Sequence, residues 1–413
     1  MITRLCCHGL SWQGSGMDPK AESMNDLGGR LMTDYPDVPG LLAHERPREP
    51  VYCIYPEVYR RAAQDFVSGF PGRVLYAVKA NNYPAIVRLL HAGGVQHFDC
   101  ASVPEVALVA EHCPGATCYF MVPTRLRGAA REAFERYGVR HFMIDHASGI
   151  DILAAEVDLR QVVVFTRVAV HHAAAMMDLS TKFGAPPEQV AGMMTALAAR
   201  GAEPALAFNV GSPVMRTEAY TYGMSVAAGV LAELPFQVNL VDIGGGFPYA
   251  YPGISAPPLR DYFHAVKQAT LALPLAPDAV IMAEPGRALA APGLSAVVEV
   301  LLRRDDRLYL NDGMYGIFWE LRFRDHDGYP FRAFRDGVPL QGETLPFRLF
   351  GPTCDSTDVL PITFLLPADI APGDYIEFGS IGAYSLSGRT AFNGYFSERI
   401  IQLSDVNAQP PGC

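Results

Sequence analysis

One lysine in the sequence stands where a strand would end. The apolar run Val74–Val78 is followed directly by Lys79. A lysine at the open end of a strand can form an imine with an aldehyde cofactor, provided that burial or nearby cations lower its pKa. Taken alone, a lysine after a strand is more often an ordinary surface residue. The position therefore indicates a nucleophile only if other strands bring suitable groups to the same place.

Turns that could bind an anion follow two later apolar runs. Three glycines, Gly244–Gly246, come directly after Val238–Ile243, and Ser212 follows Leu206–Val210. Bare backbone N–H groups in such a turn approach a phosphate closely, and a serine hydroxyl could bind the same anion. A flexible turn without a ligand explains the glycines about as well.

Charged residues and a thiol stand at two further places. Glu284 and Arg287 bracket a Pro-Gly turn after the run Val280–Ala283, and Cys354 precedes Asp355 in a later loop. A carboxylate can keep a cofactor's ring nitrogen protonated, and a guanidinium can bind a phosphate with two hydrogen bonds. A thiol beside a carboxylate could donate a proton and anchor a substrate ammonium. The plain alternatives are a surface ion pair and a turn cap.

Alternating strands and helices would position these residues. Between Val51 and about Leu289, short apolar runs alternate with amphipathic stretches. Such repetition predicts a parallel sheet, and about eight repeats predict a closed (β/α)₈ barrel with its active site at the carboxyl ends of the strands. The apolar runs are Val74–Val78, Gln96–Asp99, Cys118–Met121, His141–Ile144, Val162–Val168, Leu206–Val210, Val238–Ile243 and Val280–Ala283.

The sequence changes character after Pro292. β-Branched and aromatic runs, separated by Gly, Pro and Asp, replace the helical stretches, which predicts an antiparallel β domain. The fold class is therefore α/β, with a barrel followed by a β domain. We expect a flexible N-terminal arm over residues 1–44, the barrel over residues 45–290 and the β domain over residues 291–413.

The composition limits the functional class. Of 413 residues, 50% are hydrophobic and 18% are charged, which is enough for a large core and two domains. The net charge of −10 argues against nucleic acid as a partner. No apolar run reaches membrane-spanning length, no secretion signal stands near the N-terminus, and the eight cysteines show neither zinc spacing nor a disulfide framework. We expect a cytoplasmic protein with a small-molecule substrate, without a metal or a membrane partner.

Nine motifs in series resemble those of the fold-type III decarboxylases that depend on pyridoxal 5′-phosphate (PLP), the ornithine/diaminopimelate/arginine decarboxylase family (group IV). The resemblance is strongest to eukaryotic-type ornithine decarboxylases, and it runs from about residue 50 to residue 397. It implies a PLP-binding (β/α)₈ barrel with a C-terminal antiparallel β domain. The motifs are Y-A-V-K, F-D-C-A-S, L-S-x-K-F-G, N-V-G-S, D-I-G-G-G-F-P, E-P-G-R, N-D-G-x-Y-G, G-P-T-C-D-S-x-D and G-A-Y…F-N-G.

The resemblance implies roles for individual residues at the cofactor. Lys79 would carry PLP as a Schiff base, and Glu284 would be the partner of the pyridine nitrogen. Asp99 and Arg167 match family residues behind the cofactor, near the lysine. The remaining cofactor contacts would come from Asn209, Ser212, Gly245, Gly246, Gly286, Arg287 and Tyr384.

The resemblance also implies a dimer. In this family the residues that match Cys354 and Asp355 reach the active site of the neighbouring subunit. We therefore expect a homodimer with shared sites, in which Cys354 donates a proton and Asp355 binds the substrate.

Two departures from the family pattern bear on the substrate. Asn209 stands where the family carries a histidine that stacks on the cofactor ring. Direct counting from N-D-G-x-Y-G places Arg324 where the family has an aspartate that binds the substrate's distal amine, whereas a one-residue insertion places Asp325 there. An inward Arg324 would suit a substrate with a distal carboxylate.

The sequence predicts the PLP-dependent decarboxylation of an amino acid, with L-ornithine or lysine as the leading substrate and a diamine for polyamine biosynthesis as the product. Alternative substrates carry a second carboxylate, as diaminopimelate, carboxynorspermidine and siderophore intermediates do. An alanine-racemase-like enzyme would pair the pyridine nitrogen with arginine, whereas Glu284 stands here. A non-catalytic, antizyme-inhibitor-like homologue would lose reactive residues that this chain keeps, although Asn209 leaves that alternative open.

Overall fold

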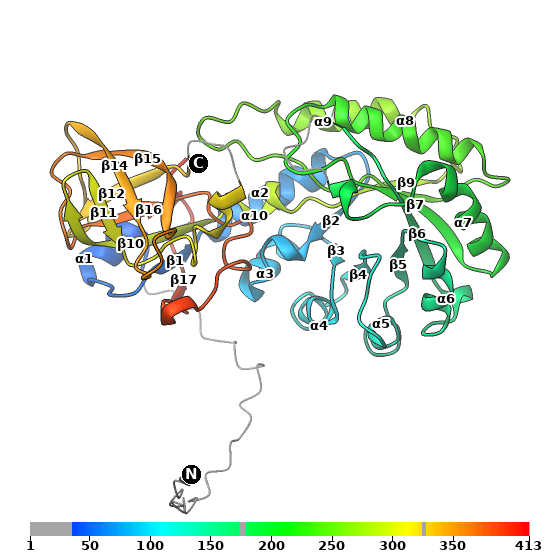
Figure 1. Cartoon of the computed structure of the whole chain (residues 1–413), viewed down its shortest axis with the longest axis horizontal. Helices are drawn as coiled ribbons and strands as arrows, with labels where there is room; N and C mark the ends of the chain where they lie inside the picture. Colours follow the sequence, from blue (N-terminus) through cyan, green and yellow to red (C-terminus); the bar gives the residue numbers. More distant parts are fainter. Residues whose placement is uncertain (1–34, 173–178, 324–327, 413) are drawn as a thin grey trace, which may run out of the picture. The chain divides into compact units, whose positions relative to one another are not determined.

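The computed structural model describes residues 35–172, 179–323 and 328–412 of the chain. Within them a barrel and a separate β-sheet can be followed in Figure 1. Most of the arm expected over residues 1–44 falls on residues 1–34, which are not among these. The last part of that segment is ordered as helix α1 (Val38–His44), which begins at the capping residue Asp37.

Eight parallel strands close into the barrel. Each strand pairs with the next one along the chain, and the last strand, β9, pairs with the first, β2. Each coincides with one of the apolar runs expected from the sequence, so the predicted barrel is confirmed. The strands are β2 (Arg73–Ala77), β3 (His97–Cys100), β4 (Thr117–Phe120), β5 (His141–Ile144), β6 (Val163–Val168), β7 (Glu203–Phe208), β8 (Leu240–Asp242) and β9 (Val280–Ala283).

Helices connect the strands of the barrel (Figure 1). Four of them, α2, α3, α4 and α7, carry proline in the first turn, where a missing N–H group costs no helical hydrogen bond. Among the described helices, none is both long and apolar enough to cross a membrane. The helices are α2 (Pro56–Gly69), α3 (Pro84–Ala92), α4 (Val103–His112), α5 (Ala129–Tyr137), α6 (Ser148–Ala154), α7 (Pro187–Ala199), α8 (Glu218–Ala232), α9 (Leu259–Thr270) and α10 (Arg287–Ala290), with the short 3₁₀ helices η2 (Val78–Ala80), η3 (Leu159–Gln161) and η4 (Leu179–Thr181).

Alternate residues of the strands fill the interior of the barrel. Leu75, Met143, Phe165 and Met282 belong to one buried cluster there. Because side chains along a strand alternate between its two faces, residues two positions apart point into the same space. The strands therefore build an apolar floor below the residues that stand at their carboxyl ends.

The second part of the molecule is a nine-stranded, mostly antiparallel sheet, as predicted for the C-terminal region. Two of its strand pairs, β1 with β17 and β11 with β14, are parallel. The strands are β1 (Val51–Ile54), β10 (Leu294–Arg304), β11 (Arg307–Leu310), β12 (Phe331–Arg335), β13 (Val338–Pro339), β14 (Thr344–Phe350), β15 (Val359–Pro367), β16 (Tyr375–Phe378) and β17 (Ile400–Gln402), with the 3₁₀ helices η5 (Trp319–Phe323) and η6 (Phe392–Gly394).

Strand β1 lies on the other side of the expected domain boundary. It falls within residues 45–290, which the sequence assigned to the barrel, but it pairs with β10 so that Val51 lies opposite Val297. Both residues belong to a buried cluster that also contains Cys53 and Ile401 of the sheet. The chain therefore contributes a strand to the sheet before it forms the barrel, and the remaining sheet strands follow the barrel.

A buried carboxylate links β16 to β12 and to Tyr55, the residue directly after β1. The side chain of Glu377 has no exposed surface, and it accepts hydrogen bonds from Arg332 Nε at 2.6 Å and from the Tyr55 hydroxyl. Removing this carboxylate would leave both donors without their acceptor.

We expect Glu377→Ala to lower the free energy of unfolding by about 2 to 3 kcal/mol, somewhat less than for a fully buried pair because Arg332 is partly exposed. Urea unfolding of the two proteins would measure the difference. The control is Glu132→Ala, which removes the exposed pair between Glu132 and Arg136 on α5 and should change stability little. Equal effects of the two substitutions would contradict the structural importance of Glu377.

Candidate active site

The residues predicted for the cofactor meet at the carboxyl ends of the barrel strands. Nine of them line one pocket there, together with Ala77 and Leu179. The contributing segments are η2, the ends of β7, β8 and β9, and the segment that follows β16 in the sheet. The predicted residues in the pocket lining are Lys79, Asn209, Ser212, Gly245, Gly246, Glu284, Gly286, Arg287 and Tyr384.

Lys79 lies in the turn of 3₁₀ helix that follows β2. Its Nζ is 3.2 Å from Oδ2 of Asp99, a buried residue of β3, while half of the lysine side chain is exposed. The Asp99 carboxylate raises the pKa of Lys79 above its ordinary value, and burial opposes this effect only in part. The sequence argument required a lowered pKa, from burial or from nearby cations, and the structure shows the opposite. Lys79 is therefore a positioned ammonium group.

The sheet domain fixes the turn that carries Lys79. The backbone N–H of Tyr384 donates to the carbonyl oxygen of Ala80 at 2.7 Å, and Asn81 Nδ2 donates to the carbonyl oxygen of Gly382 at 2.8 Å. Tyr384 has a φ of 57°, a left-handed conformation that is uncommon for tyrosine and often found at functional sites. These contacts place a phenol from the sheet domain beside the lysine of the barrel.

Three buried carboxyl groups and one guanidinium gather at the same end of the barrel. Asp99, Asp242 and Glu284 come from β3, β8 and the end of β9, and Arg167 comes from β6. Burial raises the pKa of Asp242 to about 7 and that of Glu284 well above its usual value. The charge of Asp242 raises the pKa of Glu284 further, whereas a hydrogen bond to Glu284 lowers the pKa of Asp242 in part. Glu284 Oε1 is buried and lacks a hydrogen-bond partner within the described structure. It is suited to a cationic ring nitrogen.

Asp242 was not among the residues predicted for the site. Its Oδ1 accepts a hydrogen bond of 2.7 Å from the backbone N–H of Gly244, so it closes the turn that contains the three glycines. The sequence did contain a signal, because this aspartate ends an apolar strand directly before the glycines of D-I-G-G-G-F-P. A carboxylate at the mouth of a barrel, like that of Glu284, lies where active-site residues of this fold are found.

The glycine turn packs so closely that side chains would not fit. A Cβ atom on Gly245 would lie 2.6 Å from the carbonyl oxygen of Glu284, and one on Gly246 would lie 2.3 Å from that of Gly211. Gly246 also has a φ of 97°, which disfavours other residues. The side chain of Asn209 holds the neighbouring turn, because its Oδ1 accepts from the N–H of Gly211 at 2.9 Å. Two strand ends thus present bare backbone to the pocket.

Arg287 is a buried cation that lines the same pocket. Its Nη2 is 2.6 Å from Oε1 of Glu320 in η5, and both side chains are almost fully buried. Its Nε lacks a hydrogen-bond partner in the described structure, and its guanidinium carbon lies 5.0 Å from the centre of the Tyr384 ring. Sequence reasoning missed Glu320, because a glutamate in a turn of the sheet domain carries no local signal of contact with the barrel.

The donor set fits PLP. Lys79 would supply an amine for the aldehyde, Glu284 would supply a free carboxylate oxygen for the ring nitrogen, and the glycine turn with Arg287 would supply N–H donors for the phosphate. The unpartnered Nε of Arg287 and Oε1 of Glu284 are the kinds of buried atoms that a bound ligand satisfies.

Four of the predicted residues in the described part of the chain are absent from the lining of this pocket: Asp99, Arg167, Cys354 and Asp355. Cys354 and Asp355 stand in the loop between β14 and β15, where Cys354 is exposed and its Sγ lies 3.3 Å from Oδ1 of Asn393. Asp355 accepts a hydrogen bond from the Tyr315 hydroxyl, which is the main reason why its pKa is lowered. The remaining two, Arg324 and Asp325, lie outside the part of the chain that the structure describes.

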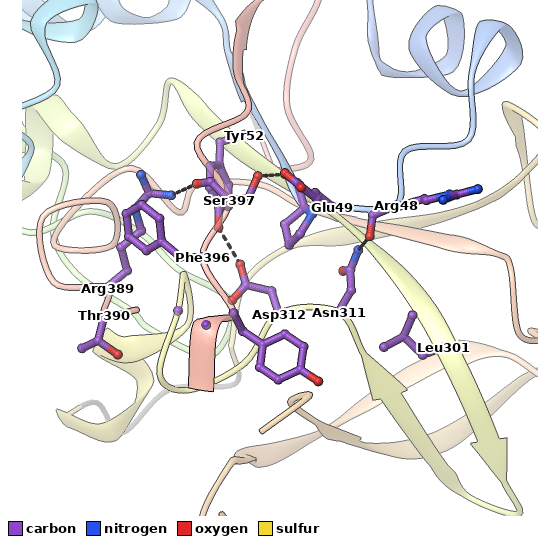
Figure 2. A pocket seen from close by; sticks show the side chains of 14 residues that line it. Arg48, Glu49, Tyr52, Leu301, Asn311, Asp312, Arg389, Thr390, Phe396 and Ser397 are labelled. Atoms are coloured by element: carbon purple, nitrogen blue, oxygen red, sulfur yellow. Dashed lines mark hydrogen bonds between the residues drawn. The ribbon is translucent and has the colours of Figure 1, made fainter. Parts of the chain in front are cut away.

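A larger pocket, of about 270 Å³, lies in the sheet domain (Figure 2). None of the residues predicted for the site lines it. Its buried carboxylate, Asp312, already accepts hydrogen bonds from the Tyr52 hydroxyl at 2.8 Å and from two backbone N–H groups. The guanidinium of Arg389 packs over the rings of Tyr52 and Phe396. We assign the chemistry to the smaller pocket, because there the buried charged groups lack partners.

Known families match the two parts of the structure in turn. Residues 57–291 match the pyridoxal binding domain of pyridoxal-dependent decarboxylases, and residues 280–382 match the C-terminal sheet domain of the same family. Lysine/ornithine decarboxylase from Selenomonas ruminantium is 32% identical over 341 residues, which cover 80% of this chain and 84% of the relative. Antizyme inhibitor 2 from Xenopus laevis is 29% identical over 351 residues, covering 78% of this chain and 73% of the relative.

A solved structure agrees with these matches. Lysine/ornithine decarboxylase from Vibrio vulnificus, in its complex with putrescine, superimposes with a TM-score of 0.75 at 28% identity and covers 86% of this chain and 94% of its own. The barrel with its lysine pocket and the sheet that follows are thus the two domains of one known architecture. The chain therefore belongs to the pyridoxal-dependent decarboxylase family, and it is a PLP-dependent amino-acid decarboxylase.

Proposed function

We propose that this enzyme decarboxylates a basic amino acid, L-ornithine or L-lysine, and releases the corresponding diamine. The observation that carries the proposal is the single pocket in which Lys79, Glu284 and Arg287 converge. The substrates named for the Selenomonas and Vibrio relatives support the basic class. A cytoplasmic location and a role in polyamine synthesis belong to the same proposal.

Each residue of the pocket has a defined task in this proposal. PLP, when bound, supplies an electron sink for the carbon that loses its carboxylate. Lys79 attaches the cofactor covalently, and Asp99 holds the lysine nitrogen in position at 3.2 Å. Glu284 keeps the ring nitrogen charged, because a buried carboxylate stabilises a cation next to it. Arg287 binds the phosphate together with the glycine turn.

The substrate's ammonium group and the proton donor come from the sheet domain in this proposal. Asp355 has a lowered pKa, so it stays ionised at neutral pH and suits a substrate ammonium. Cys354 is exposed and suits proton donation to the carbon that has lost its carboxylate. Neither residue lines the Lys79 pocket of its own chain, which supports a homodimer in which each sheet domain completes the pocket of the partner.

Two alternatives lead to different experimental outcomes. A substrate with a distal carboxylate would be favoured if Arg324 faced the substrate. A regulator without catalysis would resemble antizyme inhibitor 2. Against the second alternative, the chain keeps Lys79, Glu284 and Cys354, and its Asn209 forms an ordered turn at the edge of the pocket.

We expect PLP-loaded protein to release CO₂ from ornithine or lysine with a higher kcat/KM than from diaminopimelate, because an anionic carboxylate at Asp355 repels a second carboxylate on the substrate. A panel of diamino acids would measure this preference. Lys79→Ala is the control: it should release no CO₂ and should retain no PLP after borohydride reduction, as judged by mass spectrometry. A preference for diaminopimelate would contradict the basic substrate class, and CO₂ release from none of the panel would contradict the proposed function.

We expect Glu284→Gln to keep bound PLP but to lose about 100- to 1000-fold in kcat, because a neutral amide stabilises the charged ring nitrogen poorly. Steady-state kinetics together with the absorption of the bound cofactor would separate lost turnover from lost PLP. Glu132→Gln, on the exposed face of α5, serves as the control. A Glu284→Gln enzyme with wild-type kcat would show that this residue is not the ring partner.

We expect a mixture of Lys79→Ala and Cys354→Ala subunits, each inactive alone, to recover about a quarter of wild-type activity. With random exchange about half of the dimers are mixed, and two-fold symmetry gives each mixed dimer one intact site. Native mass spectrometry would verify subunit exchange before the assay. If verified heterodimers remain inactive, Lys79 and Cys354 do not act across a subunit interface.

A further inference from the structure

The charges below the cofactor pocket do not balance. Three carboxyl groups, those of Asp99, Asp242 and Glu284, face the two cations Lys79 and Arg167. Asp99, Asp242 and Glu284 are 2%, 0% and 8% exposed, so water stabilises their negative charges poorly. If all three were ionised, one negative charge would remain without a partner in the interior, which is costly. Binding one proton removes this imbalance.

Two further carboxyl groups, those of Glu105 and Asp145, interact with members of the cluster, and neither adds the positive charge that would remove the imbalance. Glu105, on α4, is partly buried, interacts with Asp99 and Lys79, and accepts from the N–H of Ala101 at 2.6 Å. Tyr119 contacts the cluster from the barrel interior, and its hydroxyl accepts from Arg73 at 2.9 Å. Tyr384 adds a neutral hydroxyl near Lys79.

The geometry places the missing proton between two of the carboxyl groups. Asp242 and Glu284 come from the adjacent strands β8 and β9, and the N–H of Glu284 donates to the carbonyl oxygen of Gly244 at 2.9 Å. Their carboxyl groups lie within hydrogen-bonding reach of each other. Oδ2 of Asp242 and Oε1 of Glu284 are both buried, and within the described residues neither has a hydrogen-bond donor. Two facing carboxylates without a donor repel each other, whereas one shared proton makes a strong hydrogen bond.

We propose that Asp242 and Glu284 share one proton in the cofactor-free protein and give it up when the charged ring nitrogen of PLP docks against Glu284. The O–H bond breaks, its electron pair stays on the carboxylate, and the proton leaves to water, or to the ring nitrogen if that nitrogen arrives unprotonated. Three carboxylates then face three cations. Asp242 is a positioning residue that orients Glu284 and maintains its charge. This inference rests on the role proposed for Glu284.

The direction of the pKa shifts has a consequence for stability. Burial raises the pKa of Asp242 from 3.8 to about 7. A carboxyl whose pKa is higher in the folded than in the unfolded state stabilises the fold while it is protonated. Its contribution is present at pH values below the unfolded pKa, and it is lost as the pH rises through the folded pKa. The cofactor-free protein should therefore lose stability between about pH 4 and pH 7 from this group.

The substitution Asp242→Asn introduces an amide that keeps the shape of the side chain but cannot carry the shared proton. Its oxygen can still accept from Gly244, and its amide can donate to Glu284, but it does not titrate. In cofactor-free protein, the unfolding free energy measured against pH should show about one more bound proton in folded wild type than in folded Asp242→Asn. The matched control is Asp37→Asn, at the start of α1, whose carboxylate also accepts from a glycine N–H, that of Gly40 at 2.7 Å. It should keep the wild-type slope.

Binding of PLP provides a second proton count. Calorimetric titrations in buffers with different ionisation enthalpies should show that wild type gives up about one proton more per PLP than Asp242→Asn. This difference does not depend on the protonation state of free PLP, because both proteins bind the same ligand. Equal proton counts for the two proteins would overturn the proposal.

Infrared spectroscopy tests for the shared proton in the wild-type protein itself, without any substitution. With isotope-labelled aspartate and glutamate carboxyl groups, cofactor-free protein near neutral pH should show the carbonyl band of a protonated acid, and that band should disappear when PLP is added. A spectrum that PLP leaves unchanged would overturn the shared proton, even if Asp242→Asn fails to fold. These readouts require no turnover. A protein with the expected proton release but no CO₂ release would refute the proposed function alone.

Discussion

The closed ring of eight parallel strands is the constraint on which the rest of the structure depends. Parallel strands in a ring end at the same rim, so the residues that follow them converge however far apart they lie in the chain. Lys79 and Glu284 follow the first and the last barrel strand, and these two strands pair directly to close the ring. The nucleophile and the carboxylate therefore reach one pocket because the barrel closes.

The side chains that converge at this rim carry more buried charge than water can stabilise. Ionisable groups that leave water need partners, and here they obtain them in pairs: Lys79 with Asp99, and Arg287 with Glu320. Among the described residues, Glu284 Oε1 at the pocket and two nitrogens of the nearby Arg167 guanidinium remain buried without a hydrogen-bond partner. The pocket is thus preorganised for a ligand that carries both a cation and an anion.

The sheet domain is part of this preorganisation. It holds the lysine turn through the carbonyl oxygen of Ala80, and it provides Glu320 as the partner of Arg287. It also carries the Cys354 loop outside the pocket of its own chain. A barrel without the sheet would lack the backbone contact that fixes Lys79 and the ion pair that orients Arg287.

The sequence by itself determined the barrel strands and the sheet that follows them, because strand periodicity and turn chemistry are local properties. Its motifs also predicted most of the residues that line the pocket. Only the tertiary structure decided three other features. Strand β1 joins the sheet, since a short buried run such as Val51–Ile54 carries no mark of its partner. Asp99 raises the pKa of Lys79, and Asp242 meets Glu284. These last two effects depend on burial and on distances between neighbouring strands, which exist only once the ring has closed.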